Sequence, residues 1–362
     1  MNNNMDKNVF FNFHDKDVLM EGKKDNVSYC LERTNDKNEW TPFLSFPVIK
    51  KCNFKCLYCG IGGEATASNT TSIELPLIKK LVNIGLKNGV KKFRLTGGEP
   101  LLHKDIDNIL SFFSELGYFT LVNTNGSLIT RKKELLSKLS KNIRFAVSLD
   151  TLKTEKLPMI SKNNCLKDVL DGIRLLKEYG LLMRVNMVVG KHNYDEIFDI
   201  IHFCQEMECD LKILDIVSVP VPFGKRGDIY QEVTTLEEKL SAECDDIYSH
   251  EYTRGFGTPC FRYRFGKTYV TVKNSAKGSH YDREENGICS GCQYFPCHEG
   301  LYDLFALSDS RLCACRWTEK QKSSDPETQM KFLIEAFRRS KYIPKEDNTD
   351  MEIRVDLKEK NI

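Results

Sequence analysis

From Phe43 to Val219 the chain alternates between short apolar runs and longer stretches with the periodicity of an amphipathic helix. Strands that alternate with helices form parallel sheets through right-handed crossovers. A closed eight-fold barrel needs about 250 residues, so the six units here predict an α/β fold with a partial (βα)6 TIM-like barrel over residues 43–218. Strands are predicted at 44–49, 91–96, 118–124, 143–149, 181–189 and 211–217, and helices at 75–89, 106–117, 133–140, 165–180 and 194–207.

The remainder of the chain lacks this alternation. Residues 1–42 are polar and predict an N-terminal leader or cap, and a Pro/Gly-rich segment at 220–228 indicates a boundary. Residues 219–345 are expected to form a small, irregular, cysteine-rich α+β C-terminal cap, followed by a charged tail at 346–362. The elements expected outside the barrel are strands at 9–13, 27–31, 267–273 and 301–307, and helices at 234–250 and 325–343, the last with Asp325 as N-cap.

The overall charge limits the partners of this protein. The 53 Lys and Arg residues against 51 Asp and Glu residues leave a net charge of +2, which provides no global field to hold a nucleic acid or an anionic membrane. No apolar run approaches the ~18–20 residues of a membrane span, and the first ten residues lack the apolar core of a secretory signal. We therefore expect a soluble, cytoplasmic protein with no nucleic-acid or membrane partner.

Three cysteines, Cys52, Cys56 and Cys59, share one loop directly after the first predicted barrel strand, at the end where barrel active sites are built. Thiolates in this number can hold three irons of a [4Fe–4S] cluster and leave the fourth iron open to a small molecule. A zinc site is the alternative, but structural zinc has four protein ligands. The next residues along the chain that could supply a fourth ligand, His103 and Cys165, are distant in sequence.

A second motif ends the next strand. Gly97 and Gly98 allow a ligand to approach the backbone closely. Glu99, which follows them, is expected to accept a hydrogen bond from a ligand ammonium group. By itself such a segment is also compatible with a simple turn, but here it follows a strand, one βα unit after the cysteine loop.

Together these motifs resemble those of the radical S-adenosylmethionine (SAM) enzymes. Cys52–Cys59 is similar to their CxxxCxΦC signature, and Gly97–Pro100 to their second motif. Residues 123–127, 148–151 and 185–189 with Asn193, Asp195 and Glu196 resemble the later strand-end motifs, in the form typical of the GTP 3′,8-cyclase branch of molybdenum-cofactor biosynthesis.

The resemblance implies a chemistry and a set of roles. Cys52, Cys56 and Cys59 would hold the cluster, whose open iron binds SAM. One electron from the cluster cleaves the sulfonium, and the resulting 5′-deoxyadenosyl radical abstracts a substrate hydrogen. The cofactor carries this chemistry, and the protein positions the substrate. The residues predicted to contact SAM are Tyr58, Gly97, Gly98, Glu99, Asn125, Ser127, Ser148 and Asn186.

A second group of cysteines lies in the expected cap: Cys289, Cys292, Cys297, Cys313 and Cys315. Their spacing suits structural zinc or an iron–sulfur cluster equally. By resemblance to the twitch or SPASM caps of related enzymes, we predict an auxiliary [4Fe–4S] cluster held by Cys289, Cys292 and Cys315. Cys297 is the predicted fourth ligand, and Cys313 is its alternative.

The chain also departs from the cyclase pattern. A triphosphate site generally favours Arg and Lys, but Asp303 and Phe305 stand where the cyclases carry two arginines, and His103 replaces another. The Gly-Gly tail of the cyclases is absent. The candidate catalytic residues are Lys212, Asp215 and His103, and a basic segment at 260–267 is a further candidate for anion binding.

Three functions are consistent with these features. The first is a radical SAM enzyme that acts on a small biosynthetic substrate, such as a nucleoside, sugar or amino-acid derivative, with the GTP 3′,8-cyclase as a variant. The second is a maturase that modifies a ribosomal peptide. The third is a non-catalytic iron–sulfur or zinc protein. It is the least favoured, because such a protein does not need a SAM pocket. A flavodoxin or ferredoxin is the reductant that the resemblance implies.

Overall fold

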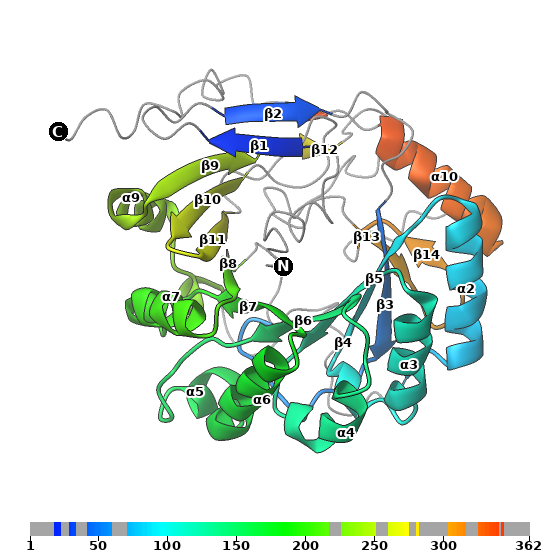
Figure 1. Ribbon diagram of the computed structural model, residues 1–362, viewed down its shortest axis with the longest axis horizontal. Coiled ribbons are helices and arrows are strands. Elements are labelled where there is room, and N and C mark those ends of the chain that lie inside the picture. Colours follow the sequence, from blue (N-terminus) through cyan, green and yellow to red (C-terminus); the bar gives the residue numbers. More distant parts are fainter. Residues whose placement is uncertain are drawn as a thin grey trace, which may run out of the picture.

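The computed structural model describes residues 18–22, 29–33, 42–59, 71–216, 226–250, 260–274, 280–281, 303–315, 325–339 and 342–343. Most of these residues belong to one α/β unit. Its main sheet has eleven strands, which curve into an arc with the helices on the outside (Figure 1). The side of the sheet that faces away from the helices is called the inner face below.

Six neighbouring parallel strands form the middle of the sheet and follow one another in chain order. All six were predicted from their apolar runs, to within a few residues at each end. They are β3 (Phe43–Ile49), β4 (Lys92–Gly97), β5 (Phe119–Thr124), β6 (Ile143–Ser148), β7 (Leu182–Val188) and β8 (Asp210–Leu214). In β4 and β8, buried apolar residues alternate with half-buried positions that are mostly polar or charged.

Helices connect these strands and pack their apolar sides against the outer face. Helix α2 (Leu75–Lys87) carries Pro76 in its first turn, where a missing N–H costs nothing. Helix α3 (Ile106–Leu116) ends at Gly117, whose φ of 79° suits glycine. The other helical elements here are η1 (Pro100–Leu102), η2 (Ile129–Lys132), α4 (Lys133–Leu136), α5 (Leu157–Ser161), α6 (Leu166–Glu178), η3 (Tyr194–Glu196) and α7 (Ile197–Glu206).

Strands from the C-terminal part of the chain extend this sheet at both edges. At one edge β11 (Thr268–Lys273) runs parallel to β8 and is followed by β10 (Cys260–Phe265) and β9 (Asp246–His250). At the other edge β13 (Asp303–Ala306) runs parallel to β3. Strand β14 (Leu312–Cys313) then pairs with β13 in an antiparallel hairpin. The sheet therefore continues across residue 218, where sequence composition places a domain boundary.

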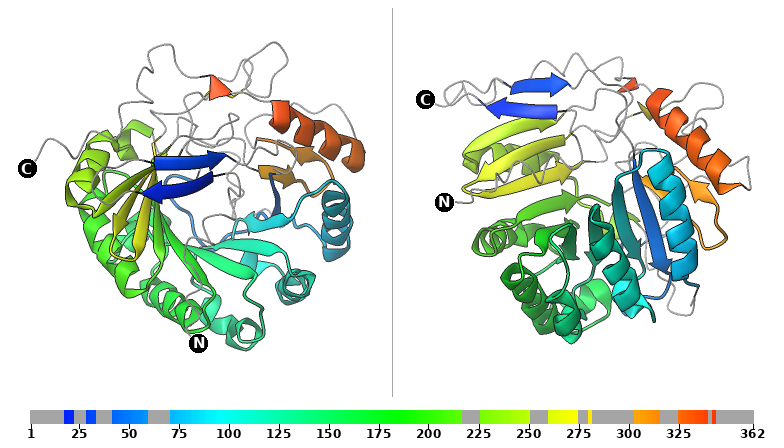
Figure 2. Two further views of the ribbon diagram at one scale, coloured as in Figure 1. Left: turned by 45° about the horizontal axis from the view of Figure 1, so that its top comes forward. Right: turned by 45° about the vertical axis from the view of Figure 1, so that its right-hand side comes forward.

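Further helices cover the ends of the sheet. Helix α10 (Pro326–Arg339) lies beside α2 (Figure 2), and the backbone N–H of Thr328 donates to Asp325 Oδ2 at 2.8 Å, which confirms the predicted N-cap. The remaining elements are α8 (Arg226–Ile229), α9 (Thr234–Glu243) and two small ribbons, β1 (Val18–Gly22) with β2 (Tyr29–Arg33) and β12 (His280–Tyr281) with β15 (Tyr342–Ile343).

Two predicted elements differ from the structure. The helix expected over 234–250 ends at Glu243, and its second half is strand β9, because those residues pair with β10. Strand β1 was not predicted, and the strand expected at 9–13 lies outside the described residues, as does the tail at 346–362. Among the described helices, none is both long and apolar enough to cross a membrane.

Side chains that alternate along the strands form two apolar layers, one on each face of the sheet. The main core lies between the outer face and the helices and includes Phe46, Phe93 and Phe145, each fully buried. A smaller apolar cluster, Phe43 with Phe119, Leu121, Ala146 and Met183, lies on the inner face. Because successive side chains point to opposite faces, residues of each central strand face alternately the helices and the inner face.

Candidate functional site

The cysteine loop leaves the sheet at the carboxyl end of β3. Pro47 lacks the N–H that a central strand needs, and the register between β3 and β4 shifts at Pro47–Ile49, just before the loop. The loop then hydrogen-bonds to α5: the Lys55 N–H donates to Ser161 O at 2.8 Å and the Leu57 N–H to Ile160 O at 2.9 Å. It is therefore a fastened segment, not a free connection.

The three thiols of this loop, Cys52, Cys56 and Cys59, are half-buried. Burial raises the pKa of Cys52 to about 11, against the opposing hydrogen bond from the Phe54 N–H. Burial also raises the pKa of Cys56 well above its ordinary value, and the Asp150 carboxylate adds to the effect. Because a metal binds the thiolate, binding of iron here releases protons and depends on pH.

The donor set suits a cluster better than a single ion. Within the described ranges, no three His, Cys, Asp or Glu side chains converge closely enough to hold one metal ion. The ligands of a [4Fe–4S] cluster have no need to converge, because each thiolate binds a different iron of a cubane. Three thiols on one fastened loop therefore fit such a cluster with one iron left for a small ligand.

Gly97 and Gly98 bring the end of β4 against the residues that lead into the cysteine loop. The Gly98 N–H donates to Ile49 O at 2.7 Å and the Glu99 N–H to Lys51 O at 2.9 Å. A Cβ on Gly98 would lie 2.2 Å from Lys51 O, and Gly97 has a φ of 134°. Only glycines permit this approach, so the second motif positions the first.

The Glu99 side chain forms hydrogen bonds within the protein interior. Its side chain is fully buried and accepts hydrogen bonds from the Leu101 N–H (3.0 Å), the Thr124 hydroxyl (2.7 Å) and the Asn125 N–H (2.7 Å). Burial raises the pKa of Glu99 to about 7, although these hydrogen bonds oppose the shift. The carboxyl group thus ties the end of β4 to the end of β5. The Gly97–Gly98 backbone beside it is half-exposed.

Asn125 and Ser127 form a closed hydrogen-bond ring with Asn53 of the cysteine loop. Asn125 Nδ2 donates to Asn53 Oδ1 at 2.8 Å and lies 3.9 Å from Cys52 Sγ. Asn53 Nδ2 donates to Ser127 Oγ at 2.9 Å, and Ser127 Oγ donates to Asn125 Oδ1 at 2.7 Å. The ring orients the first thiol. Sequence reasoning missed Asn53, although its place between two predicted ligands was a usable signal.

Tyr58 fastens the far end of the loop. Its hydroxyl donates to Asp150 Oδ2 at 2.5 Å, and Asp150 Oδ1 accepts from the Val188 N–H at 2.9 Å. Burial raises the pKa of Asp150 to about 6, while these hydrogen bonds favour its charged form. The loop is thereby joined to the ends of β6 and β7. The Tyr58 hydroxyl is engaged in this contact.

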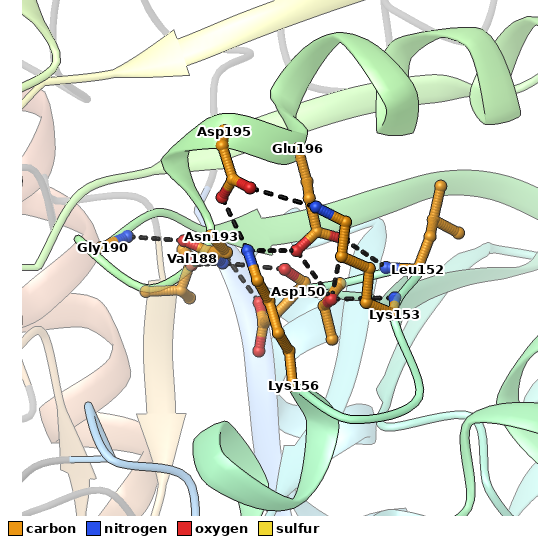
Figure 3. Close-up of polar contacts among 10 residues, drawn as sticks. Asp150, Leu152, Lys153, Lys156, Val188, Gly190, Asn193, Asp195 and Glu196 are labelled. Atoms are coloured by element: carbon orange, nitrogen blue, oxygen red, sulfur yellow. Dashed lines mark hydrogen bonds and ion pairs between the residues drawn. The ribbon is translucent and has the colours of Figure 1, made fainter.

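The other residues of the later motifs form a frame behind Asp150 (Figure 3). The fully buried Glu196 accepts from the Thr151 hydroxyl (2.9 and 2.8 Å) and from the Leu152 N–H (3.0 Å), and it pairs with Lys156 at 2.9 Å. Asn193 Nδ2 donates to Asp150 O at 2.8 Å. The loop after β7 is thus held against the loop after β6 by Asn193, Asp195 and Glu196. The role of these residues here is structural.

Three predicted residues meet on the inner face. Ser148 of β6 is in register with Asn186 of β7, and Asn186 with Lys212 of β8. All three are half-buried near the carboxyl ends of their strands. They form a polar row across three neighbouring strands.

The other two candidate catalytic residues are more enclosed. His103 is 2% exposed; its Nδ1 accepts from the Asp105 N–H at 3.0 Å, and burial lowers the pKa of the imidazole. It is therefore neutral at pH 7 and shielded from solvent. Asp215, one residue past β8, is 3% exposed. Of the three candidates, Lys212 is the one on the inner face.

A layer of charge deeper on the inner face was not predicted. Arg94 Nη1 pairs with Asp303 Oδ2 at 2.5 Å, and the Ser45 hydroxyl donates to Asp303 Oδ1 at 2.5 Å. Arg184 donates from Nε to Asn186 Oδ1 at 2.9 Å. Burial lowers the pKa of Arg184 to about 10, and the positive charge of Arg94 contributes. Strand alternation placed these residues inward, but single charges in strands had no motif to mark them.

The second cysteine group is described in part. Cys313 is buried in β14 and Cys315 is half-buried two residues further. Cys313 follows Leu312, which joins the main core, and it is in register with Phe305 of β13, so its thiol lies on the inner side of the sheet. Cys289, Cys292 and Cys297 lie outside the described residues, and the auxiliary cluster stays a prediction.

Comparison with known proteins agrees with this site. Residues 46–204 match the Radical SAM superfamily. A GTP 3',8-cyclase of Helicobacter pylori strain J99 is 30% identical over 287 residues, which cover 77% of this chain and 81% of that protein. The chain belongs to the radical SAM superfamily, a family whose members use a [4Fe–4S] cluster and SAM, and the predicted class of enzyme is confirmed at this level.

Two further likenesses are more limited. A GTP 3',8-cyclase of Helicobacter pylori strain HPAG1 is 34% identical over 190 residues, half of this chain, and the match spans 57% of the relative's length. The crystal structure of Streptococcus suis SuiB bound to S-adenosylmethionine superimposes with a TM-score of 0.58 at 17% identity, over 82% of this chain and 66% of SuiB. That likeness shows a shared α/β fold with a parallel-rich sheet.

Proposed function

We propose that this protein is a radical SAM enzyme that generates a 5′-deoxyadenosyl radical at the cysteine loop and uses it on a small substrate held on the inner face. Cys52, Cys56 and Cys59 would ligate the [4Fe–4S] cluster. The observation that carries the proposal is the fastening of this loop, through Asn125 and Tyr58, to the carboxyl ends of the central strands.

SAM would lie between the loop and the strand ends. The Gly97–Gly98 backbone is half-exposed beside the loop and suits the methionine amino group. Ser148 and Asn186 lie in register near the carboxyl ends of β6 and β7, on the same face. They suit the ribose hydroxyls, because both side chains can donate and accept hydrogen bonds. The central strands, in this interpretation, are the six strands of a partial TIM-like barrel with the cofactor at its carboxyl-end opening.

The inner face indicates the class of substrate. Lys212 lies beside Asn186 at the carboxyl end, and Arg184 lies two residues deeper on β7. Buried cations of this kind favour a substrate with a carboxylate or a phosphate. A small anionic nucleoside, sugar or amino-acid derivative therefore fits better than a neutral one.

GTP 3',8-cyclisation is the second candidate, and the relatives named above favour it. The side chains at three positions oppose it. Asp303, where the resemblance expects an arginine, neutralises Arg94 in a 2.5 Å pair. His103, in place of another arginine, is buried and uncharged. Phe305, at the third position, carries no charge. The triphosphate would therefore lack three of its expected partners.

The test is anaerobic reconstitution of the wild type and of a Cys52→Ala/Cys56→Ala/Cys59→Ala variant, with iron and sulfide counted per chain. The variant should lose about four irons, since each cluster holds that number. After reduction with dithionite, the wild type should release 5′-deoxyadenosine from SAM, and the variant should not. No 5′-deoxyadenosine from a fully loaded and reducible wild type would overturn the proposal. Added GTP that yields a cyclised product would select the second candidate.

A further inference from the structure

Arg184, on the inner face, is a buried cation without an anionic partner. Its side chain is 9% exposed, and its Nε donates to Asn186 Oδ1 at 2.9 Å. Neither Nη atom forms a hydrogen bond or an ion pair with any group that the structure describes. Burial lowers the pKa of the guanidinium only to about 10, so the group is charged at pH 7. Such a charge is costly unless an anion pairs with it.

Two other arginines of this face have partners inside the protein. Arg94 pairs with Asp303 at 2.5 Å. Arg144 Nη2 donates to Leu182 O at 2.6 Å. Arg184 differs from both, because its two Nη nitrogens are left as a planar pair of donors. A carboxylate accepts two parallel hydrogen bonds from a pair of this geometry.

A second unpartnered group lies in the same cross-strand row. Asn123 of β5 is in register with Ala146 of β6, and Ala146 with Arg184 of β7. Neighbouring strands are about 4.8 Å apart, so the backbones of Asn123 and Arg184 are separated by about 10 Å. Asn123 Oδ1 is enclosed and accepts no hydrogen bond. Because buried acceptors are almost always bonded, this atom suits a ligand that brings an N–H or O–H donor.

The charge of this region favours one kind of anion. Four charged groups act most strongly on Arg184: Arg94, Arg262, Asp210 and Asp303. Three guanidinium groups against two carboxylates leave one positive charge. A carboxylate balances this charge, whereas a phosphate monoester, which carries nearly two negative charges at pH 7, exceeds it. The surrounding arginines also disfavour an ammonium group, so a neutral N–H is the better donor to Asn123 Oδ1.

We propose that Arg184 and Asn123 bind the substrate through a carboxylate and a neutral N–H, and that the substrate is an N-acylated amino acid. This inference rests on the proposed function, because it names the class of substrate held on the same inner face. Arg184 would donate from both Nη atoms to the carboxylate, and Asn123 Oδ1 would accept from the amide N–H. The hydrogen bond from Arg184 to Asn186 joins this site to a residue proposed to hold the ribose of SAM.

The first test uses N-acetylglycine, which carries both groups in a minimal form, with three matched compounds. N-Acetylsarcosine lacks the N–H, N-acetylglycinamide lacks the charge, and inorganic phosphate replaces the carboxylate. Each is titrated by calorimetry into the reconstituted, SAM-loaded protein at constant ionic strength. N-Acetylglycine should bind about tenfold more tightly than each of the others, because each lacks one of the two interactions. Equal binding of N-acetylsarcosine would overturn the role of Asn123, and tighter binding of phosphate would overturn the choice of a carboxylate.

Variants locate the binding at these two residues. Arg184→Gln should weaken N-acetylglycine about tenfold or more, and Arg184→Lys, which keeps the charge without the planar pair of donors, should weaken it less. Asn123→Leu should lower the affinity for N-acetylglycine to that for N-acetylsarcosine. Arg144→Gln is the matched control at an arginine with an internal partner and should bind like the wild type. Unchanged affinity in Arg184→Gln, or an equal loss in Arg144→Gln, would overturn the inference.

Thermal unfolding distinguishes a ligand site from a structural role. Arg184→Gln removes an uncompensated buried charge and should melt no lower than the wild type, whereas Arg144→Gln loses an internal hydrogen bond and should melt lower. A markedly lower melting temperature of Arg184→Gln would identify a structural residue and overturn the inference. Release of 5′-deoxyadenosine by a wild type that does not bind N-acetylglycine would overturn this inference alone. No release from a fully loaded wild type that binds it would count against the proposed function.

Discussion

Substitution of Gly98 by alanine tests whether the glycines hold the cysteine loop in place. The new Cβ would lie 2.2 Å from Lys51 O and 2.5 Å from Lys51 C, against ordinary contacts of 3.4–4 Å. The two backbones must therefore separate by about 1 Å. That movement breaks the 2.9 Å hydrogen bond from the Glu99 N–H to Lys51 O and strains the 2.7 Å bond from Gly98.

The magnitude follows from these two bonds. Each contributes about 1 kcal/mol net, and a buried N–H left without a partner costs about 1–3 kcal/mol. We expect Gly98→Ala to lower the free energy of unfolding by about 3 kcal/mol, or the melting temperature by about 4 °C for a chain of 362 residues. Because Lys51 adjoins Cys52, iron uptake by the loop should fall by about half or more.

The assay pairs thermal unfolding with iron and sulfide counts after anaerobic reconstitution. Gly117→Ala is the matched control: residue 117 has a φ of 79° but open space where the Cβ would lie, so it should cost about 1 kcal/mol and leave iron uptake unchanged. If Gly98→Ala loads iron like the wild type and melts no lower than Gly117→Ala, the glycines do not position the loop.

Three further predictions follow from the same contacts. Burial raises the pKa of Glu99 from 4.5 to about 7. The protonated carboxyl therefore stabilises the fold fully below pH 4.5, and this contribution is lost as the pH rises through 7. In urea unfolding across that range, the free energy of unfolding of the wild type should fall by about 3 kcal/mol relative to that of Glu99→Gln. Asp303→Asn leaves the largely buried Arg94 without its anion and should cost about 2–3 kcal/mol; a shift in urea midpoint no larger than that of an exposed Asp→Asn change would contradict this. Asn125→Ala breaks the ring beside Cys52 and should reduce 5′-deoxyadenosine release about tenfold with iron content largely retained, whereas complete loss of iron would show that the ring holds the metal itself.

Sequence patterns predicted the central sheet well. The runs that became β3–β8 are rich in apolar residues, and apolar residues recur about every 3.6 residues in the helices between them, so that local pattern and tertiary packing agree. The N-cap at Asp325 was also predicted, because cap chemistry is local.

Long-range pairing accounts for the elements that differed. Residues 246–250 continue a helical pattern from α9, yet they form β9 because β10 offers them backbone partners and Arg264 pairs with Asp246. The placement of β11 beside β8 and of β13 beside β3 is likewise a matter of sheet-edge pairing. No local propensity encodes which edge a distant strand joins.

The sequence by itself determined the chemistry of this protein: three thiols on one loop, two glycines at the next strand end, and the family to which they belong. These features are readable because each depends on residue type at fixed local spacing. Only the tertiary structure decided that Glu99, Asn125 and Ser127 are internal fasteners of the cysteine loop, that His103 is enclosed, and that Arg94, Arg184 and Asp303 share the inner face. The physical reason is burial, because what a polar side chain does depends on the hydrogen-bond partners that distant strands bring to it.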